Sequence, residues 1–377
     1  MYTLKRGGAY DRFIMMVEAF LDRQCEVHCL SLTPIQIPHP GYHNHVISLP
    51  FRVGSGLITK SMVFILFPIY SLLIGWRERV NLFVSFGLLY AFLQTIPKWV
   101  LKKPMVTLIR GNASFGLKTQ DPSKYFLWLN KIIEYLGLMF SNRVITINKA
   151  IQEEMIQITR NRKKIKVDVL YNNIPSIPDI KPEDVSQTKV QLGIPQEAKV
   201  LVTAGVINNG KNIEILIKCI SQIRINSLFL LIIGEGSTKT DFRYQNYLKE
   251  LTTKLGLNKK VIFTGWLKKE KLWKIFRASD LFILPSRSEG MPNVLLEALG
   301  CDIPCLGSNI SGIRDILYHG VLMFDPFDAE TLARKIGCFL SDRAFFSKIS
   351  QLCQERKERF IFDWKQAAFK IIIELLR

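Results

Sequence analysis

The sequence predicts an α/β protein built from two parallel-sheet domains, on three observations. Short apolar runs alternate with stretches of helical periodicity along the chain, a pattern typical of parallel strands wrapped by helices. A proline-rich, polar segment, Ile174 to Pro195, interrupts this alternation near the middle. The 377 residues also exceed what one ordinary core accommodates. We therefore expect two Rossmann-like domains facing each other across a cleft, with ligands at the carboxyl ends of the strands.

The first half contains a short strand, Met1 to Leu4, a glycine pair and a periodic helix over Tyr10 to Arg23. Its most apolar stretch, Met62 to Gly75, is interrupted by Pro68 and is shorter than the ~20 residues of a membrane span. We expect a helix that is buried, or else interfacial. The histidine-bearing segment His39 to His45 is expected to be a loop. Further predicted strands are Val27–Leu32, Asn81–Ser85, Met105–Ile109, Arg143–Ile147 and Val167–Tyr171.

The second half repeats the alternation and ends in an amphipathic helix, Phe362 to Arg377. These patterns predict a first domain over 1–173, a linker over 174–198, a second domain over 199–360 and a C-terminal helix over 361–377. The strands predicted in the second domain are Lys199–Ala204, Leu228–Gly234, Val261–Gly265, Leu281–Pro285 and Ile303–Leu306.

The net charge of +19 is concentrated in the first 175 residues, which hold 22 lysines and arginines against 10 acidic residues. The densest cluster runs from Arg160 to Lys166. No nucleic-acid-binding motif accompanies it, so the charge predicts contact with an anionic membrane surface or lipid-linked substrate, or a merely solvated helix end, and no nucleic acid. Seven irregularly spaced cysteines favour neither disulfides nor a metal site, and no cleavable signal peptide opens the chain. We expect a cytoplasmic protein.

The strongest functional signal lies in Ser286 to Gly300, SRSEGMPNVLLEALG. An apolar strand and a glycine turn lead into a helix for which Pro292 or Asn293 is a favoured first-turn residue. Such a helix start aims unpaired N–H groups at one point, where an anion binds well. Glu289 and Glu297 lie eight residues apart beside that point and can hold hydroxyl groups. Phosphate together with a polyol is what a nucleotide sugar offers.

This segment resembles the donor-site signature of glycosyltransferase family four, in which Glu, seven residues and Glu enclose Gly-Met-Pro-Asn. The resemblance covers the second half of the chain well and the first half loosely. It implies the GT-B fold, in which the C-terminal helix returns to the first domain, and sugar transfer with retention of anomeric configuration. Four further segments match in the expected order: Val202–Ile217, Leu231–Gly236, Phe263–Trp266 and Ser308–Ile316.

The resemblance also implies donor-site roles. Glu297 would bind the ribose hydroxyls and Glu289 the hexose hydroxyls, although either could instead complement a helix start. Lys211, six residues after Gly205, would stabilise the diphosphate, because no Asp-x-Asp motif for a metal occurs. The family's arginine after that glycine is Val206 here. Glu289 and Lys211 are the expected catalytic residues. Backbone contacts to the donor are expected at Gly205, Gly234, Gly236, Gly290, Met291, Pro292, Asn293, Val294 and Leu295.

On the first domain, Gly7 and Gly8 resemble the family's opening glycine loop, which lies near the diphosphate and the acceptor. Arg110 stands where many relatives carry a histidine. It would bind an anionic group of donor or acceptor, or form an interdomain salt bridge.

These observations predict a retaining, metal- and cofactor-independent transferase at the inner face of a membrane. It would move a hexose from a UDP- or GDP-linked donor to a glycan or lipid-linked acceptor in cell-surface polysaccharide, including lipopolysaccharide, biosynthesis. Two alternatives remain open. One is a sugar-nucleotide epimerase or soluble glucoside synthase of the same fold. The other is a degenerate, non-catalytic member that binds nucleotide sugar or lipid, an alternative that Val206 and the missing histidine at Arg110 motivate.

Overall fold

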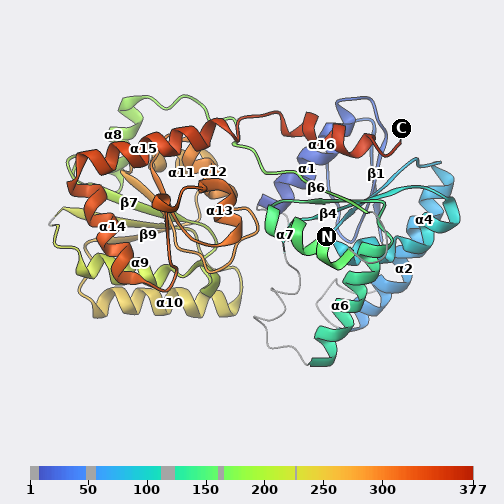
Figure 1. Cartoon of the computed structure of the whole chain (residues 1–377), viewed down its shortest axis with the longest axis horizontal. Coiled ribbons are helices and arrows are strands. Elements are labelled where there is room, and N and C mark those ends of the chain that lie inside the picture. Colours follow the sequence, from blue (N-terminus) through green and yellow to red (C-terminus); the bar gives the residue numbers. More distant parts are fainter. Residues whose placement is uncertain (1–7, 48–56, 112–123, 160–164, 226, 377) are drawn as a thin grey trace. The chain divides into compact units, whose positions relative to one another are not determined.

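The computed structural model describes residues 8–47, 57–111, 124–159, 165–225 and 227–376, which form two compact units (Figure 1). The first unit combines Met1–Tyr171 with Asp363–Arg377, and the second is Asn172–Phe362. Each unit contains parallel strands covered by helices, which confirms the predicted α/β class.

The second unit is one six-stranded parallel sheet in the order β12-β11-β10-β7-β8-β9. Helices α9, α10 and α14 cover one face and α8, α11, α12 and α15 the other (Figure 1). Its strands are β7 Lys199–Ala204, β8 Leu228–Ile233, β9 Val261–Gly265, β10 Leu281–Leu284, β11 Cys305–Ser308 and β12 Met323–Phe324. Its helices are α8 Pro182–Gln191, η1 Asn209–Lys211, α9 Ile213–Gln222, α10 Lys239–Lys254, α11 Lys269–Arg277, α12 Asn293–Gly300, α13 Ser311–Leu317, η2 Gly320–Leu322, α14 Ala329–Ser341 and α15 Arg343–Glu358.

Strand β10 lies at the middle of this sheet and is fully buried, as its uninterrupted apolar run predicts. Phe282 aligns with Val202 of β7 on one side and with Cys305 of β11 on the other. The loops after β7 and β10 therefore leave the same edge of the sheet. They carry the lysine and the first glutamate of the expected donor site.

Residues 174–198, which the sequence predicts to be a linker, contain helix α8. Its first helical residue is Pro182, and Glu183 and Asp184 follow in the first turn, where acidic side chains complement the helix dipole. Asp184 forms an ion pair with Lys274 of α11 at 2.6 Å. This part of the chain thus packs as a helix within the second unit.

The first unit has two separate sheets, a parallel pair β1-β2 and a four-stranded parallel sheet β3-β4-β5-β6. The predicted strand Met1–Leu4 lies outside the described residues. The strands are β1 Val27–Ser31, β2 Tyr42–Val46, β3 Phe83–Phe86, β4 Met105–Ile109, β5 Arg143–Thr146 and β6 Lys166–Val169. The helices are α1 Gly8–Leu21, α2 Leu57–Arg77, α3 Leu88–Leu93, α4 Thr95–Leu101, α6 Lys124–Met139, α7 Lys149–Thr159 and α16 Trp364–Ile373.

The histidine-bearing segment is a strand, so the loop predicted over His39 to His45 is wrong for most of its length. Tyr42 to Val46 pair in parallel with β1, and His28 of β1 lies 3.1 Å from His45, ring nitrogen to ring nitrogen. His28 also stacks on His43. Backbone pairing with β1 and ring stacking across the two strands stabilise this strand. Its polar side chains alone did not predict it.

A cavity of about 580 Å³ lies between the two sheets of the first unit. The edges of β1 and β3, which do not pair with each other, line it together with residues of α1 and α2. None of the residues expected to bind the donor belongs to its lining.

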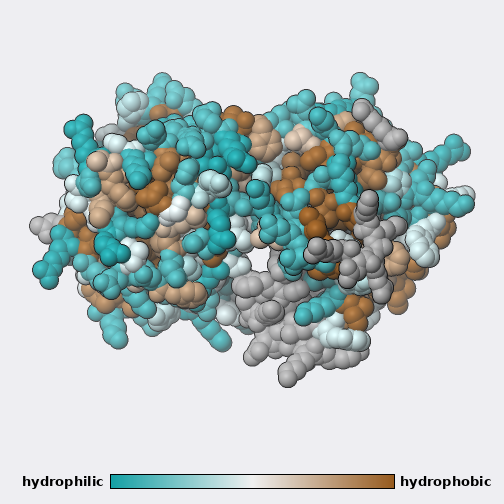
Figure 2. Space-filling model, in the orientation of Figure 1, coloured by the Kyte–Doolittle hydropathy of each residue, from teal (hydrophilic) through white to brown (hydrophobic). Residues whose placement is uncertain are grey.

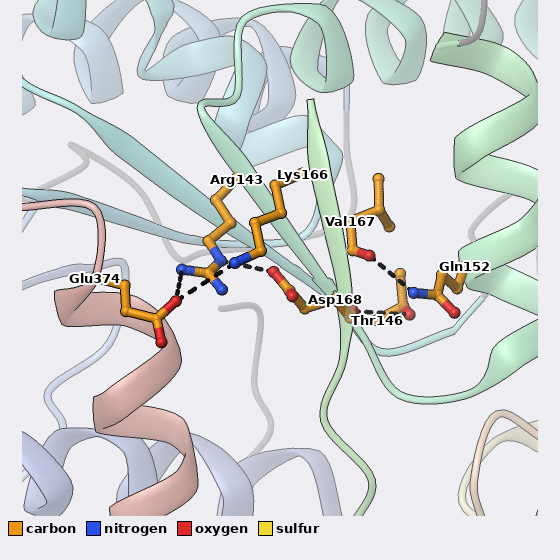
Figure 3. A network of polar contacts seen from close by, with 7 residues as sticks. All are labelled: Arg143, Thr146, Gln152, Lys166, Val167, Asp168 and Glu374. Carbon is orange, nitrogen blue, oxygen red and sulfur yellow. Dashed lines mark hydrogen bonds and ion pairs between the residues drawn. The ribbon is translucent and has the colours of Figure 1, made fainter. Parts of the chain in front are cut away.

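Helix α16 packs on α1 although the two lie at opposite ends of the chain. Lys365 pairs with Glu18 of α1 at 2.7 Å, and the Arg12 guanidinium lies over the Trp364 ring. At the other end of α16, Glu374 accepts from the buried Arg143, which also pairs with Asp168 (Figure 3).

Candidate active site

Three glycines end neighbouring strands of the second unit in close backbone contact. The N–H of Gly234, after β8, donates to the carbonyl of Gly265 at the end of β9 (2.9 Å). Gly205, after β7, donates to Ile233 at 2.9 Å. Gly205 and Gly234 have φ of +143° and +125°, and a Cβ on Gly234 would lie 1.9 Å from the Gly205 carbonyl oxygen. Only glycine fits this junction, which opens the carboxyl edge of the sheet to a ligand.

Gly236 serves a different contact. A Cβ there would lie 2.8 Å from the Phe242 nitrogen of α10, and the Gly236 N–H donates to Gln245 at 2.8 Å. This glycine thus allows the loop after β8 to approach the start of α10.

Lys211 is held at the end of a single helical turn. The Asn208 side chain caps this turn by accepting from the Lys211 N–H, and Asn212 follows in the left-handed conformation. The Lys211 ammonium lies 2.5 Å from Oε1 of Glu289. The structure therefore joins the two residues expected to be catalytic, although 78 residues separate them in the sequence.

Glu289 is positioned from several sides. The hydroxyl of the fully buried Ser286 donates to its Oε1 at 2.7 Å, and Ser308 donates in turn to the Ser286 carbonyl. Gly312 of α13 packs directly under the Glu289 backbone, since a Cβ there would lie 2.5 Å from the Glu289 carbonyl oxygen. These contacts hold the carboxylate without contributions from solvent-exposed side chains.

The loops of Lys211 and Glu289 are also tied to each other through the residues beside them. The Arg287 N–H donates to the Gly210 carbonyl at 2.8 Å. The Arg287 side chain pairs with Glu214 at 2.7 Å, and Glu214 also accepts from the Tyr244 hydroxyl. These contacts keep the Lys211 ammonium and the Glu289 carboxylate within contact distance of each other at the carboxyl edge of the sheet.

Helix α12 begins at Asn293 with Pro292 as its N-terminal flanking residue, in agreement with the predicted helix start. No side chain caps this end, so its first N–H groups suit an anion. The Leu295 N–H is already used within the turn, since it donates to the Pro292 carbonyl at 3.2 Å. Glu297 follows in the second helical turn and is buried, with 8% of its surface exposed.

Asn172 supports this helix start from the beginning of the second unit. Its buried side-chain amide donates to the Asn293 Oδ1 at 2.7 Å and to the Met291 carbonyl at 3.2 Å. The loop from Gly290 to Asn293 is thus tied to a residue more than 100 positions earlier.

The residues expected on the acceptor side belong to the first unit. Gly7 lies outside the described residues, and Gly8 is the first residue of α1. Arg110 follows β4. Burial, and secondly the nearby Arg12, lower the pKa of its guanidinium to about 9. Arg110 and Gly8 thus belong to the first unit, whereas the Lys211–Glu289 pair belongs to the second.

Several residues that position the site were not predicted from the sequence. Ser286, Asn208 and Arg287 lie within the matched segments, and only their contacts distinguish them from the other polar residues there. Asn172 carries no local signal, because its partners lie far away in the sequence. Ser308 begins the matched segment Ser308–Ile316, but its contact with Ser286 is not predicted by that match. Among the described residues, no group of three or more His, Cys, Asp or Glu side chains could hold a metal ion.

The arrangement combines a cation, a paired carboxylate, an uncapped helix start and glycine turns that permit close backbone approach. A cation and free N–H groups stabilise phosphate oxygens, and carboxylates accept from sugar hydroxyls. This is the chemistry needed to hold a sugar nucleotide.

Comparison with known proteins agrees with this geometry. Residues 184–359 match the family model of the group 1 glycosyl transferases. The chain is 30% identical over 219 residues to an uncharacterised glycosyltransferase of Methanocaldococcus jannaschii, covering 56% of this chain and 54% of that protein. It is 25% identical to the N-acetyl-alpha-D-glucosaminyl L-malate synthase of Bacillus anthracis, over 76% of each chain.

A third relative is the UDP-Gal:alpha-D-GlcNAc-diphosphoundecaprenol alpha-1,3-galactosyltransferase of Escherichia coli, 28% identical over 55% of this chain and 52% of that one. The chain thus spans about half the length of two of these three curated relatives. Among solved structures, HepE from Anabaena, in complex with UDP, superposes with a TM-score of 0.76 at 20% identity, over 99% of this chain and 96% of that one.

The likeness to HepE extends over both units and establishes the fold, while the family match lies within the second unit, where the Lys211–Glu289 pair is found. The chain therefore has the GT-B fold, and its second unit is similar to the group 1 glycosyl transferases.

Proposed function

We propose that the protein transfers a hexose from a nucleotide-diphosphate sugar to a glycan or lipid-linked acceptor, with retention of configuration and without a metal ion. The observation that carries this proposal is the Lys211–Glu289 pair at the carboxyl edge of the sheet, beside the uncapped start of α12. A diphosphate needs positive charge and N–H donors as it leaves, and this edge offers both.

In the proposed reaction the anomeric C–O bond to the diphosphate breaks and the acceptor oxygen bonds the same face of the sugar. The proton of the acceptor hydroxyl passes to an oxygen of the leaving diphosphate. An ammonium has three donors. Lys211 gives one to Glu289 in this structure, and the others would stabilise the developing phosphate charge. Val206 supplies no cation, so Lys211 carries more of this task.

Glu289 would orient the hexose. Its two side-chain contacts in the described structure, from Lys211 and Ser286, both use Oε1. We therefore expect Oε2 to accept from a sugar hydroxyl. Glu297, buried in the second turn of α12, would accept from both ribose hydroxyls.

The identity of the donor is proposed from the fold relative. HepE has been solved with UDP and with UDP-glucose, which favours a uridine-linked hexose here. GDP-linked donors remain in the test because nothing in the described loop selects the base.

A lipid-linked acceptor is proposed from two observations. One relative is named for transfer to a diphosphoundecaprenol-linked sugar, and the first 175 residues carry a large positive excess that suits lipid phosphate. With such an acceptor the protein would act at the cytoplasmic face of a membrane, in the assembly of cell-surface polysaccharide.

A second candidate is a synthase of soluble glucosides, because one relative that aligns over three quarters of the chain is named N-acetyl-alpha-D-glucosaminyl L-malate synthase. Turnover with a soluble hydroxy acid and indifference to vesicles would favour it. Turnover only with a lipid-linked acceptor would exclude it.

The first experiment is thermal unfolding with UDP, GDP, ADP and CMP, in wild type and in Glu297→Gln and Glu297→Ala. A ligand at 100 times its Kd stabilises the folded state by ~2.7 kcal/mol. We expect UDP to raise the midpoint in wild type and the substitutions to abolish the rise. Absence of a shift with all four nucleotides would contradict the proposed donor site and favour a degenerate member of the family.

A further inference from the structure

Helix α2 of the first unit is apolar on both of its faces. Val63, Phe67 and Ser71 form a buried stripe toward the core. On the opposite side Ile65, Ile69, Leu73 and Trp76 recur at helical spacing and stay exposed, with Trp76 72% exposed. A surface helix of a soluble domain normally turns a polar face to water. We therefore expect a binding partner to cover the outer face of α2.

Helix α4 continues this exposed apolar surface. Ile96, Trp99 and Val100 lie at positions i, i+3 and i+4 of the helix, and each is at least 60% exposed. The two helices pack together at their C-terminal ends, where a Cβ on Gly75 would lie 2.7 Å from Leu101 of α4. We call the seven exposed residues the apolar face: Ile65, Ile69, Leu73, Trp76, Ile96, Trp99 and Val100. Apolar side chains gather in this part of the first unit in Figure 2.

Positive charge surrounds the junction of the two helices. Arg77 and Arg79 follow Trp76, and Lys102 and Lys103 follow α4. Glu78 is the one acidic residue among residues 76–80 and 99–103, and it pairs with Arg77. The helix ends that meet at Gly75 thus combine two exposed tryptophans with a net positive charge.

We propose that the apolar face docks on an anionic lipid bilayer. Exposed apolar patches mark interaction surfaces, and three features select lipid over protein as the partner. Tryptophan favours the membrane–water interface, lysine and arginine bind anionic headgroups, and aliphatic side chains at helical spacing enter the acyl boundary. No helix in the described part of the chain is long and apolar enough to cross a membrane, so the contact is with one leaflet.

This inference goes beyond the proposed reaction, because it needs neither the donor site nor a particular acceptor. It uses residues of the first unit only, whereas nucleotide binding is assigned to the second. Failure of one can therefore be measured without failure of the other.

The test is flotation of the full chain with vesicles of phosphatidylcholine, alone or mixed with phosphatidylglycerol. We expect binding to the mixed vesicles that weakens with salt, and a loss of at least about tenfold in the variant Ile69→Ser, Leu73→Ser, Trp76→Ser. A charge variant, Arg77→Gln, Arg79→Gln, Lys102→Gln, should lose a similar factor on mixed vesicles. The matched control, Val190→Ser with Phe346→Ser, removes exposed apolar residues of the second unit and should bind as wild type does.

Thermal unfolding midpoints measured without nucleotide should stay close to the wild-type value in these variants and show that they are folded. The proposal is overturned if wild type does not float, if it floats equally with phosphatidylcholine alone, or if the apolar variant still floats like wild type. A wild-type dimer in sedimentation that the apolar variant converts to monomer would assign this face to a second copy and also overturn it.

Discussion

The two units are built from the same kinds of strands and helices but arrange them differently. In the second, six parallel strands form one continuous sheet, and its carboxyl edge gathers Gly205, Lys211, Gly234 and Glu289 within a few contacts. In the first, the strands divide into two sheets around a cavity, and two helices expose apolar side chains. The difference fits the division of labour that we propose, with donor binding at the carboxyl edge of the second unit and membrane contact through the exposed apolar side chains of the first.

The largest expected effect tests how closely the backbone packs at the carboxyl edge of the second unit's sheet. Gly234→Ala places a Cβ 1.9 Å from the Gly205 carbonyl oxygen at a φ that L residues avoid, so we expect a loss of about 4 kcal/mol or more in the free energy of unfolding. Urea denaturation followed by circular dichroism measures it. Gly337→Ala, in α14 with open space around it, is the control and should be neutral or stabilising by up to ~1 kcal/mol. Equal midpoints for the two variants would refute the close-approach argument.

The next largest effect is on turnover and not on the stability of the fold. Lys211→Ala removes the cation from the proposed diphosphate site, and we expect about 10²- to 10³-fold slower nucleotide release from the donor. Lys218→Ala, an exposed lysine of the following helix α9, should retain wild-type turnover. If both variants turn over at the same rate, Lys211 has no part in the reaction.

A smaller effect tests the support of the α12 start. Asn172→Ala deletes the buried amide that donates to Met291 and Asn293, so two acceptors lose their partner and we expect a loss of about 2 kcal/mol in stability. The loop would loosen, and UDP affinity should fall by roughly tenfold. Asn173→Ala removes the bond to the Phe362 carbonyl and should leave UDP affinity unchanged in calorimetry. Wild-type affinity in both variants would show that the loop keeps its geometry without Asn172.

The smallest effect concerns the first unit and its stacked histidines. Burial first, then neighbouring charges that include His43, lowers the pKa of His28 below 6.5, and burial likewise lowers the pKa of His45. Below about pH 6.5 the unfolded chain therefore binds more protons than the folded one, so stability falls as the pH decreases through that value. Because both rings are partly exposed, we expect less than about 1 kcal/mol.

Urea midpoints at about pH 7.5 and 5.5 measure this dependence, and His28→Gln with His45→Gln should flatten it. A wild-type midpoint that rises on acidification would show that the sign is wrong. The pH dependence of stability would then have to come from titratable groups other than His28 and His45. The stacked histidines would no longer distinguish the first unit from the second.

Much of the second unit could be predicted from the sequence. Strands β7, β8 and β10 are mainly apolar runs followed by glycine or proline, and burial on both faces of a parallel sheet demands that pattern. The start of α12 follows from Pro292 and Asn293 in the same way. Prediction was weaker where stability comes from distant partners. Residues 42–46 become a strand by pairing with β1, and residues 182–191 become a helix that packs on α11.

By itself the sequence determined the α/β class, five of the six strands of the second unit, and the two motifs that carry Lys211 and the pair Glu289 and Glu297. Local patterns encode these because side-chain periodicity and backbone preference act over a few residues. Only the tertiary structure decided that Lys211 meets Glu289, that Asn172 holds the α12 start and that one face of α2 stays exposed. Each of these depends on side chains that approach through the fold from distant positions, and no local pattern records such an approach.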